Sequence, residues 1–231
     1  MPRPMPQHGP PVITAIVGPY AVGKTSLIQA FAMPGIGASR FTSPTIGAAV
    51  ANHLFPLPES AASVGGSGSG MGCHTIWDTA GQERYASLVP MYTRNCDILI
   101  VAVPATEDPD PETVRRLLVA ALPPIRSPKV IKGVLTKCDL VTPATALKRR
   151  LLLEEIITES PQSLNRQFEI HTYQTSAYNG DGVEECLGAC VEAVYLFKLD
   201  KQESKREQEE AMVRVSEGER APTRGRCTGG C

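Results

Sequence analysis

The sequence predicts an α/β fold with a mostly parallel sheet and helices on both faces. Short runs rich in Val, Ile and Thr alternate with longer helical patterns along the chain. This alternation is the order in which a parallel sheet is built from strands and crossover helices. Three of the runs are apolar almost throughout, as expected for strands covered on both faces. We expect ligands at the carboxyl ends of such strands.

The expected elements can be placed along the chain in order. Strands are predicted over residues 12–18, 74–79, 98–103, 130–136 and 168–175. Helices are predicted over residues 24–32, 111–122, 143–159 and 182–199. Pro111 and Pro143 suit the first turn of a helix, where no N–H is needed for a helical hydrogen bond.

One folded domain, residues 12–199, accounts for most of the 231 residues, of which 42% are hydrophobic. We expect residues 1–11 to be a disordered N-terminal extension. Residues 58–72 are rich in Gly and Ser and predict a flexible insertion at a hairpin tip. Residues 200–231 are polar and rich in charge, which predicts a disordered tail.

The composition excludes several classes of protein. A net charge of −1 gives no electrostatic case for nucleic-acid binding. Seven cysteines without metal-type spacing favour a reducing compartment, and Cys186 and Cys190 are interpreted as small buried thiols. The N-terminus carries no secretory pattern, and no run of residues is apolar enough for a membrane-spanning helix. We therefore expect a soluble, cytosolic protein.

A phosphate-binding loop is predicted at Gly18–Ser26, "GPYAVGKTS", between a strand and a helix. Its pattern, G-x-x-x-x-G-K-[ST], turns backbone N–H groups toward phosphates, places Lys24 near the β and γ oxygens and lets Thr25 ligate Mg²⁺. The alternative is a Gly-rich turn with an incidental lysine. ATPases and small-molecule kinases share the motif, so it leaves the base open. The nucleotide-binding candidates here are Gly18, Ala21, Val22, Gly23, Lys24, Thr25 and Ser26.

The segment Trp77–Tyr85, "WDTAGQERY", has the chemistry of a phosphate sensor. Asp78 at the strand end is expected to hold Mg²⁺ through its water. Gly81 can offer its backbone N–H to a γ-phosphate with no side chain in the way. Gln82 is the candidate catalytic residue, directed at the nucleophilic water.

A base-recognition site follows the next strands. In "TKCD", Thr136–Asp139, a buried Asp139 carboxylate can accept hydrogen bonds from N1–H and the exocyclic amine of guanine, a donor pair that adenine lacks. Lys137 is expected to lie along the ring. Ser176, Ala177 and Tyr178 of "TSAYNG" complete the candidate pocket, with the Ala177 N–H near guanine O6. The alternative is an ordinary polar loop after a strand.

These motifs, in this order, resemble the Ras-type small GTPases over residues 12–197. Within that superfamily the sequence is similar to the Rab family. "TIGAA", Thr45–Ala49, and the segment from Trp77 to Asn95 are close to its early-endosomal subgroup. The resemblance implies a P-loop NTPase with a Ras-like G domain and a six-stranded sheet, binding GTP, GDP and Mg²⁺. It implies that Thr45 is a Mg²⁺ ligand and that Val50, Trp77 and Tyr92 occupy effector-contacting positions.

The resemblance also implies partners and a location. The expected partners are an exchange factor, a GTPase-activating protein, effectors, prenyl-transfer proteins and a GDP-dissociation inhibitor, acting on a monomer. Cys227 and Cys231 are the candidate lipidation sites, because two lipid chains anchor stably where one binds only marginally. The alternative is free thiols on a polar tail. The expected place is the cytosolic face of endosomal membranes.

Several departures from the family keep alternatives open. Tyr20 lies at the loop position nearest the γ-phosphate, where relatives mostly have a small residue, and predicts slow hydrolysis. Tyr178 replaces a lysine, and Val50 replaces an aromatic residue. The leading interpretation is a Mg-dependent GTP switch in vesicular traffic. The second is a GTPase-impaired binding module of the same fold, and the third is an ATP-using enzyme, which Asp139 disfavours.

Overall fold

A single six-stranded sheet forms the centre of the molecule in the computed structural model, which describes residues 9–34, 43, 45–57, 70–81, 87–122, 128–161 and 168–218. The strand order is β2-β3-β1-β4-β5-β6. All neighbouring pairs are parallel except β2 and β3. The strands are β1 (Val12–Val17), β2 (Ala48–Pro56), β3 (Met71–Thr79), β4 (Ile98–Pro104), β5 (Val130–Thr136) and β6 (Glu169–Gln174).

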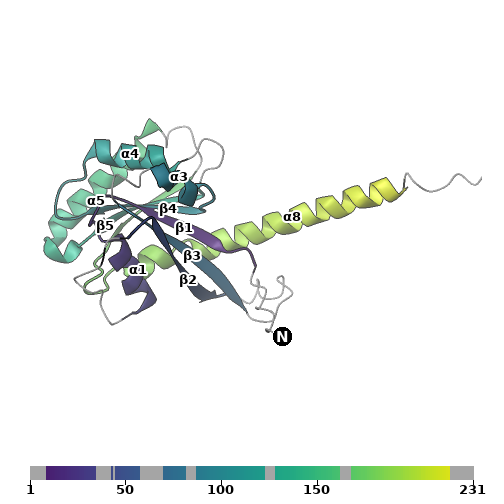
Figure 1. Ribbon diagram of the computed structural model, residues 1–231, viewed down its shortest axis with the longest axis horizontal. Coiled ribbons are helices and arrows are strands. Elements are labelled where there is room, and N and C mark those ends of the chain that lie inside the picture. Colours follow the sequence, from purple (N-terminus) through teal and green to yellow (C-terminus); the bar gives the residue numbers. More distant parts are fainter. Residues whose placement is uncertain are drawn as a thin grey trace, which may run out of the picture.

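Helices cover both faces of this sheet, as predicted (Figure 1). One hydrophobic cluster joins the sheet to α1, α7 and α8. A second cluster joins the opposite face to α3, α4 and α5. Neighbouring residues of the central strands alternate between the two clusters, so both faces of these strands must be apolar. The helices are α1 (Lys24–Ala32), α3 (Val89–Thr93), α4 (Pro111–Ala121), α5 (Pro143–Thr158), α7 (Val183–Gly188) and α8 (Val191–Gly218).

The helix starts predicted from proline are confirmed. Asp110 precedes Pro111, and its carboxylate accepts a hydrogen bond from the Thr113 N–H at 2.9 Å. Thr142 precedes Pro143 and caps α5 in the same way through its hydroxyl. These side chains satisfy backbone donors that have no partner within the helix.

The hairpin of β2 and β3 differs from the prediction. β3 begins at Met71, three residues before the expected start, and Met71 and Gly72 pair with Pro56 and Phe55 of β2. Residues 71 and 72, predicted to be part of the flexible insertion, therefore belong to β3, and residues 58–69 lie outside the described part. β2 is an edge strand with one partner, so its sequence lacks the continuous apolar run of a central strand.

The C-terminal helix was predicted too short. A break at residues 189–190 separates α7 from α8, and α8 continues to Gly218, well past the sheet (Figure 1). The expected disorder from residue 200 is therefore wrong as far as residue 218. This segment is rich in Lys, Glu, Gln and Arg, which are good helix formers, and Lys205 and Glu209 form an ion pair one turn apart.

The N-terminal extension was predicted disordered as far as residue 11, but residues 9–11 are described and lie against α8. The Lys198 ammonium donates to the Pro11 carbonyl at 2.5 Å and to the Asp97 carboxylate at 2.6 Å. Asp97 also accepts from the Ile13 N–H at 2.9 Å. This shared contact fixes the chain entering β1.

Candidate nucleotide-binding site

The loop from Gly18 to Lys24 joins β1 to α1 and is shaped by backbone conformations that favour small residues. Gly23 has φ +106°, and Ala21 has φ +57°, both in the left-handed region. A Cβ at Gly18 would collide with the Ala102 carbonyl of β4. The loop therefore lies close against the sheet and ends at the N-terminus of α1, where backbone N–H groups have no helical partner.

Lys24 is a buried cation inside this loop. Its ammonium donates to the Gly18 carbonyl at 2.9 Å and to the Pro19 carbonyl at 2.8 Å, and only 6% of the residue is exposed. Burial lowers the pKa of Lys24 to about 8, although the nearby Asp78 carboxylate partly opposes this shift. An anion bound beside Lys24 would stabilise its charged form.

Three oxygen-bearing side chains converge next to Lys24. The hydroxyls of Thr25 and Thr45 donate to Oδ2 of Asp78 at 2.7 Å and 3.0 Å, and the two hydroxyl oxygens lie 2.9 Å apart. Among the described residues, Asp78 Oδ1 is buried and has no hydrogen-bond partner. All three residues are predicted from the sequence for a metal site, and the structure brings them together.

These residues fit a bound Mg²⁺. Magnesium prefers oxygen ligands, and neighbouring ligands of an octahedral ion with bonds of about 2.1 Å lie roughly 3 Å apart. The separation of the Thr25 and Thr45 hydroxyls, 2.9 Å, matches that spacing. The Asp78 carboxylate accepts hydrogen bonds from both hydroxyls, and its second, buried oxygen could accept one from a water molecule bound to Mg²⁺.

Gly81 lies directly against the phosphate-binding loop. A Cβ on this residue would collide with the Lys24 ammonium and the Pro19 carbonyl. Only glycine fits at this approach, and the role predicted for its backbone N–H stays a prediction. Gln82, the candidate catalytic residue, lies outside the described residues.

A pocket of about 370 Å³ lies at the carboxyl ends of β5 and β6. Asp139, Lys137, Ala177 and Tyr178 line it, together with residues at the start of α1. The buried Ser176 hydroxyl donates to the Asp139 carboxylate at 2.6 Å and so orients it. The expectation that Asp139 is buried is wrong, because it lies in a short 3₁₀ turn after the strand and is exposed.

The segment around Thr136 connects the phosphate-binding loop to the pocket lined by Asp139. The Thr136 hydroxyl donates to the Val22 carbonyl of the loop at 2.5 Å, and the Lys137 ammonium donates to the Ala21 carbonyl at 2.8 Å. Lys137 itself has φ +59°. These contacts fix the base-sized pocket relative to the phosphate loop. Ser26 lines the same pocket from α1.

The three predicted effector positions also lie together. Val50 of β2 pairs with Trp77 of β3, and the Trp77 and Tyr92 rings lie 5.3 Å apart. Val50 is exposed, while the two aromatic residues are half-buried. They form a continuous surface beside the Asp78–Gly81 segment. The candidate lipidation sites, Cys227 and Cys231, lie outside the described residues.

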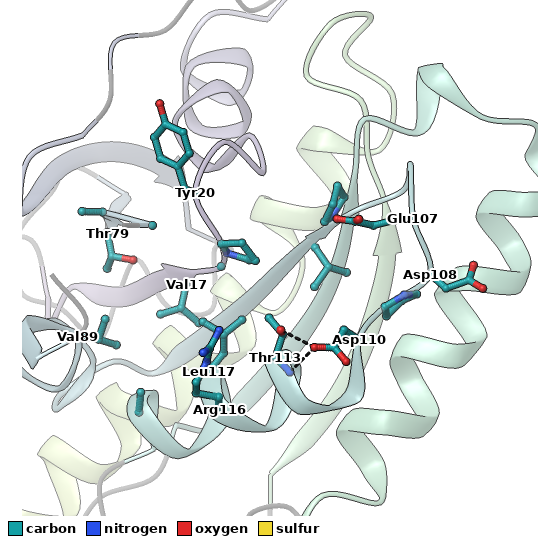
Figure 2. A pocket seen from close by; sticks show the side chains of 18 residues that line it. Val17, Tyr20, Thr79, Val89, Glu107, Asp108, Asp110, Thr113, Arg116 and Leu117 are labelled. Carbon is teal, nitrogen blue, oxygen red and sulfur yellow. Dashed lines mark hydrogen bonds between the residues drawn. The ribbon is translucent and has the colours of Figure 1, made fainter. Parts of the chain in front are cut away.

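A larger cavity of about 780 Å³, which sequence analysis missed, lies beside the loop (Figure 2). Its lining runs from Pro19 and Tyr20, past Gly81, to α4. Tyr20 is 57% exposed, and its ring lies apart from the Asp110–Thr113 pair (Figure 2). No local motif marks such a cavity, since its walls come from segments distant in sequence.

The cysteine interpretation is half confirmed. Cys186 is fully buried, and burial raises its pKa to about 12. Cys190, expected to be buried, is only half-buried because it lies in the turn between α7 and α8. All five cysteines within the described residues are free thiols.

A Gly-rich loop around a buried lysine, joined to a hydroxyl–carboxylate cluster on a parallel sheet, defines the P-loop class of nucleotide-binding proteins. The sequence model of the Ras family matches residues 14–196. The chain therefore belongs to the Ras family of small GTPases.

Comparison with individual proteins agrees. The chain is 38% identical over 92 residues to GTP-binding protein ypt5 of Schizosaccharomyces pombe, an alignment that spans 40% of this chain and only 38% of that relative. It is 26% identical over 193 residues to the Ras-like GTP-binding protein RYL2 of Yarrowia lipolytica, covering 84% of this chain and 83% of RYL2. It is 26% identical over 197 residues to GTP-binding protein YPT52 of Saccharomyces cerevisiae, covering 80% and 82%. Within the described residues, no helix has an apolar stretch long enough to cross a membrane.

Proposed function

We propose that this protein is a Rab-type molecular switch that binds GTP and GDP with Mg²⁺, hydrolyses GTP slowly and regulates endosomal membrane traffic. The observation that carries the proposal is the convergence of Thr25, Thr45 and Asp78 from three separate segments. A metal site of this kind is complete only when the segment bearing Thr45 is in place.

Each residue of the site has a distinct role in this proposal. The Gly18–Lys24 loop holds the phosphates through backbone N–H groups, and Lys24 neutralises their charge. Thr25 and Thr45 hold Mg²⁺, which would neutralise developing charge on the phosphate oxygens. Gly81 contacts the γ-phosphate through its N–H, and Gln82 orients the attacking water. Loss of the γ-phosphate releases the segments of Thr45 and Gly81.

Guanine selectivity rests on Asp139. Its carboxylate, oriented by Ser176 at 2.6 Å, can accept two hydrogen bonds from guanine and none of the same kind from adenine. The Ala177 N–H is the candidate donor to guanine O6. The Lys137 stem and the Tyr178 ring are the candidates to pack on the base.

Slow hydrolysis follows from Tyr20. Tyr20 lines the same cavity as Gly81, and we expect its ring to displace the attacking water from its reactive position. Small-GTPase hydrolysis without an activating protein proceeds at only about 10⁻⁴ to 10⁻³ s⁻¹, and a displaced water can cost about 100-fold more.

The partners and the location complete the proposal. An exchange factor, an activating protein and effectors would act on the segments around Thr45 and Gly81, with effectors meeting Val50, Trp77 and Tyr92. Lipids on Cys227 and Cys231 would attach the monomer to endosomal membranes, helped by prenyl-transfer proteins and a GDP-dissociation inhibitor. A second candidate, favoured by the tyrosine at position 20 in the wall of the cavity that Gly81 also lines, is a GTPase-impaired scaffold that stays in one nucleotide state.

Single-turnover hydrolysis tests the proposal. The purified protein is loaded with GTP and Mg²⁺, freed of excess nucleotide, and its bound GTP and GDP are separated by chromatography over hours. Conversion to GDP supports the switch, and intact bound GTP supports the scaffold. Failure to retain GTP, or equal retention of ATP, would contradict both.

A further inference from the structure

The edge strand β6 carries a group of metal-binding side chains away from the nucleotide site. Glu169 is the first residue of β6, at the amino end of the parallel sheet. The nucleotide-binding residues follow the carboxyl ends of the strands, roughly 20 Å away along a strand of this length. The group is therefore separate from the site described above.

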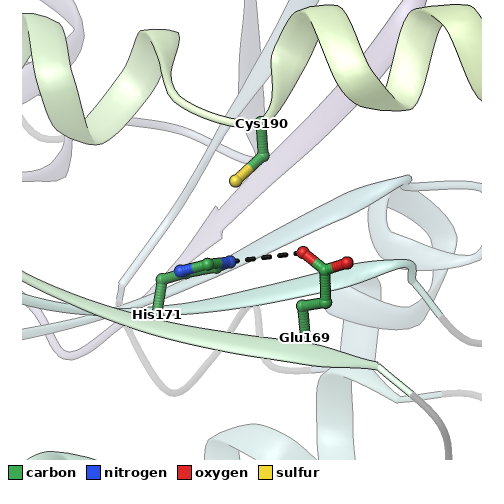
Figure 3. A group of neighbouring side chains, drawn as sticks. All are labelled: Glu169, His171 and Cys190. Atoms are coloured by element: carbon green, nitrogen blue, oxygen red, sulfur yellow. Dashed lines mark hydrogen bonds and ion pairs between the residues drawn. The ribbon is translucent and has the colours of Figure 1, made fainter.

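Three side chains of different chemistry meet there. Glu169 and His171 are two residues apart on one strand, so they lie on the same face of the sheet. Cys190 comes from the turn between α7 and α8, which covers that face. Their ligand atoms all lie within 4.8 Å of one another, and the Cys190 sulfur points toward the other two side chains (Figure 3).

The separations are close to those of a tetrahedral metal site. With Zn–N, Zn–O and Zn–S bonds of about 2.0–2.3 Å, neighbouring ligands of zinc lie roughly 3.3–3.7 Å apart. The His171 Nε2 and Glu169 Oε2 atoms are already 3.4 Å apart. The sulfur lies within 4.8 Å of both other ligand atoms, so it needs a movement of at most about 1 Å, within the range of a side-chain rotation. The exposed fractions, 39% for the His171 side chain and 74% for Glu169, leave the group open to an ion.

The surroundings hold Cys190 in place. Lys132 of β5 is the register partner of His171, and its buried ammonium donates to the Cys186 and Ala189 carbonyls at 2.6 Å each. These bonds fasten the turn to the sheet. Cys190 has φ +66°, a conformation that favours glycine, so the chain places a thiol where one is conformationally disfavoured.

The donor charges also attract a dication. A thiolate and the Glu169 carboxylate supply two negative charges, of which the neighbouring Lys132 ammonium offsets one, and His171 ligates as a neutral ring. A mixed set of sulfur, nitrogen and oxygen donors selects zinc-class transition metals over Mg²⁺ or Ca²⁺. We propose that Glu169, His171 and Cys190 form a binding site for a zinc-class divalent ion, with water as the fourth ligand.

Cobalt titration tests this site directly. The full chain, saturated with GDP and Mg²⁺ so that the nucleotide site is filled, is titrated with CoCl₂, and Co²⁺ is then displaced with ZnCl₂. We expect one Co²⁺ per chain and a thiolate-to-cobalt charge-transfer band in the near ultraviolet. Replacing Cys190 with Ser should abolish the band. His171→Ala and Glu169→Gln should each weaken binding by about 10-fold or more.

Matched variants separate this site from other thiols. Cys73→Ser removes another half-buried thiol, on β3, and should leave the titration unchanged. Replacing Cys227 and Cys231 with Ser removes the tail thiols and should leave the band in place. Cys190→Gly relieves the left-handed backbone, so it should fold and hold GDP normally while losing the band. Absence of the band in the wild type, or its persistence in Cys190→Gly, would overturn the proposal.

Discussion

The buried ammonium of Lys24 predicts that nucleotide binding takes up a proton at mildly alkaline pH. Burial lowers the pKa of Lys24 to about 8 in the protein without nucleotide. Phosphates beside the ammonium favour its charged form and should return the pKa above 10. Lys24 is partly neutral in the free protein and fully protonated in the nucleotide-bound protein. Binding must therefore take up a fraction of a proton equal to the difference between these two protonated fractions. That difference is about 0.1 proton at pH 7, about 0.5 at pH 8 and about 0.9 at pH 9.

Calorimetry measures this proton number. Nucleotide-free protein is titrated with GDP and Mg²⁺ in buffers of different ionisation enthalpy, and the slope of the binding enthalpy against that quantity gives the protons taken up. Lys24→Arg is the control, since a guanidinium stays protonated throughout this range. A proton uptake that stays constant between pH 7 and pH 9, or that rises equally in Lys24→Arg, would refute the reasoning.

Three other substitutions test separate parts of the structure. Tyr20→Ser should speed single-turnover GTP hydrolysis by on the order of 10-fold or more, because it frees the space needed by the attacking water; an unchanged rate would end the idea. Asp139→Asn should weaken GDP binding by about 100-fold or more in a fluorescent-nucleotide competition assay, since guanine loses its paired acceptor, and ATP binding should not improve. Lys132→Met should lower the free energy of unfolding in urea by about 2 kcal/mol, since it leaves the Cys186 and Ala189 carbonyls without their charged donor; a stability equal to the wild type would show that relief of the buried charge offsets both bonds.

The residues predicted for the candidate nucleotide site lie together in the structure, because the chemistry of such a site requires fixed residues at fixed spacing. Lys24 and Thr25 must follow the glycine loop at the start of a helix, and α1 begins at Lys24 as expected. Asp78 must end a strand beside that loop, and β1 and β3 are parallel neighbours with Ile16 paired to Asp78. The central strands were equally predictable, since burial on both faces leaves continuous apolar runs.

Other features depend on contacts between distant segments and leave weak local signals. β2 is half-exposed at the edge, so its pattern does not stand out from loops. The break before α8 depends on the left-handed backbone of Cys190, and cysteine is not a residue from which the end of a helix is predicted. Glu169, His171 and Cys190 come together only because the turn between α7 and α8 lies against β6, and no sequence spacing predicts this contact.

The long α8 helix limits the orientations that the folded domain can adopt relative to its C-terminal segment. The part of α8 beyond Leu199 is about 28 Å long as a helix, whereas a flexible chain with the same number of residues has a mean end-to-end distance of about 25 Å. The helix therefore barely changes the distance that the segment spans, but it gives the segment a defined direction. A flexible coil would let the domain rotate freely relative to its C-terminal segment, but a helix that continues past the sheet (Figure 1) restricts which face of the domain can turn toward a partner bound at that end.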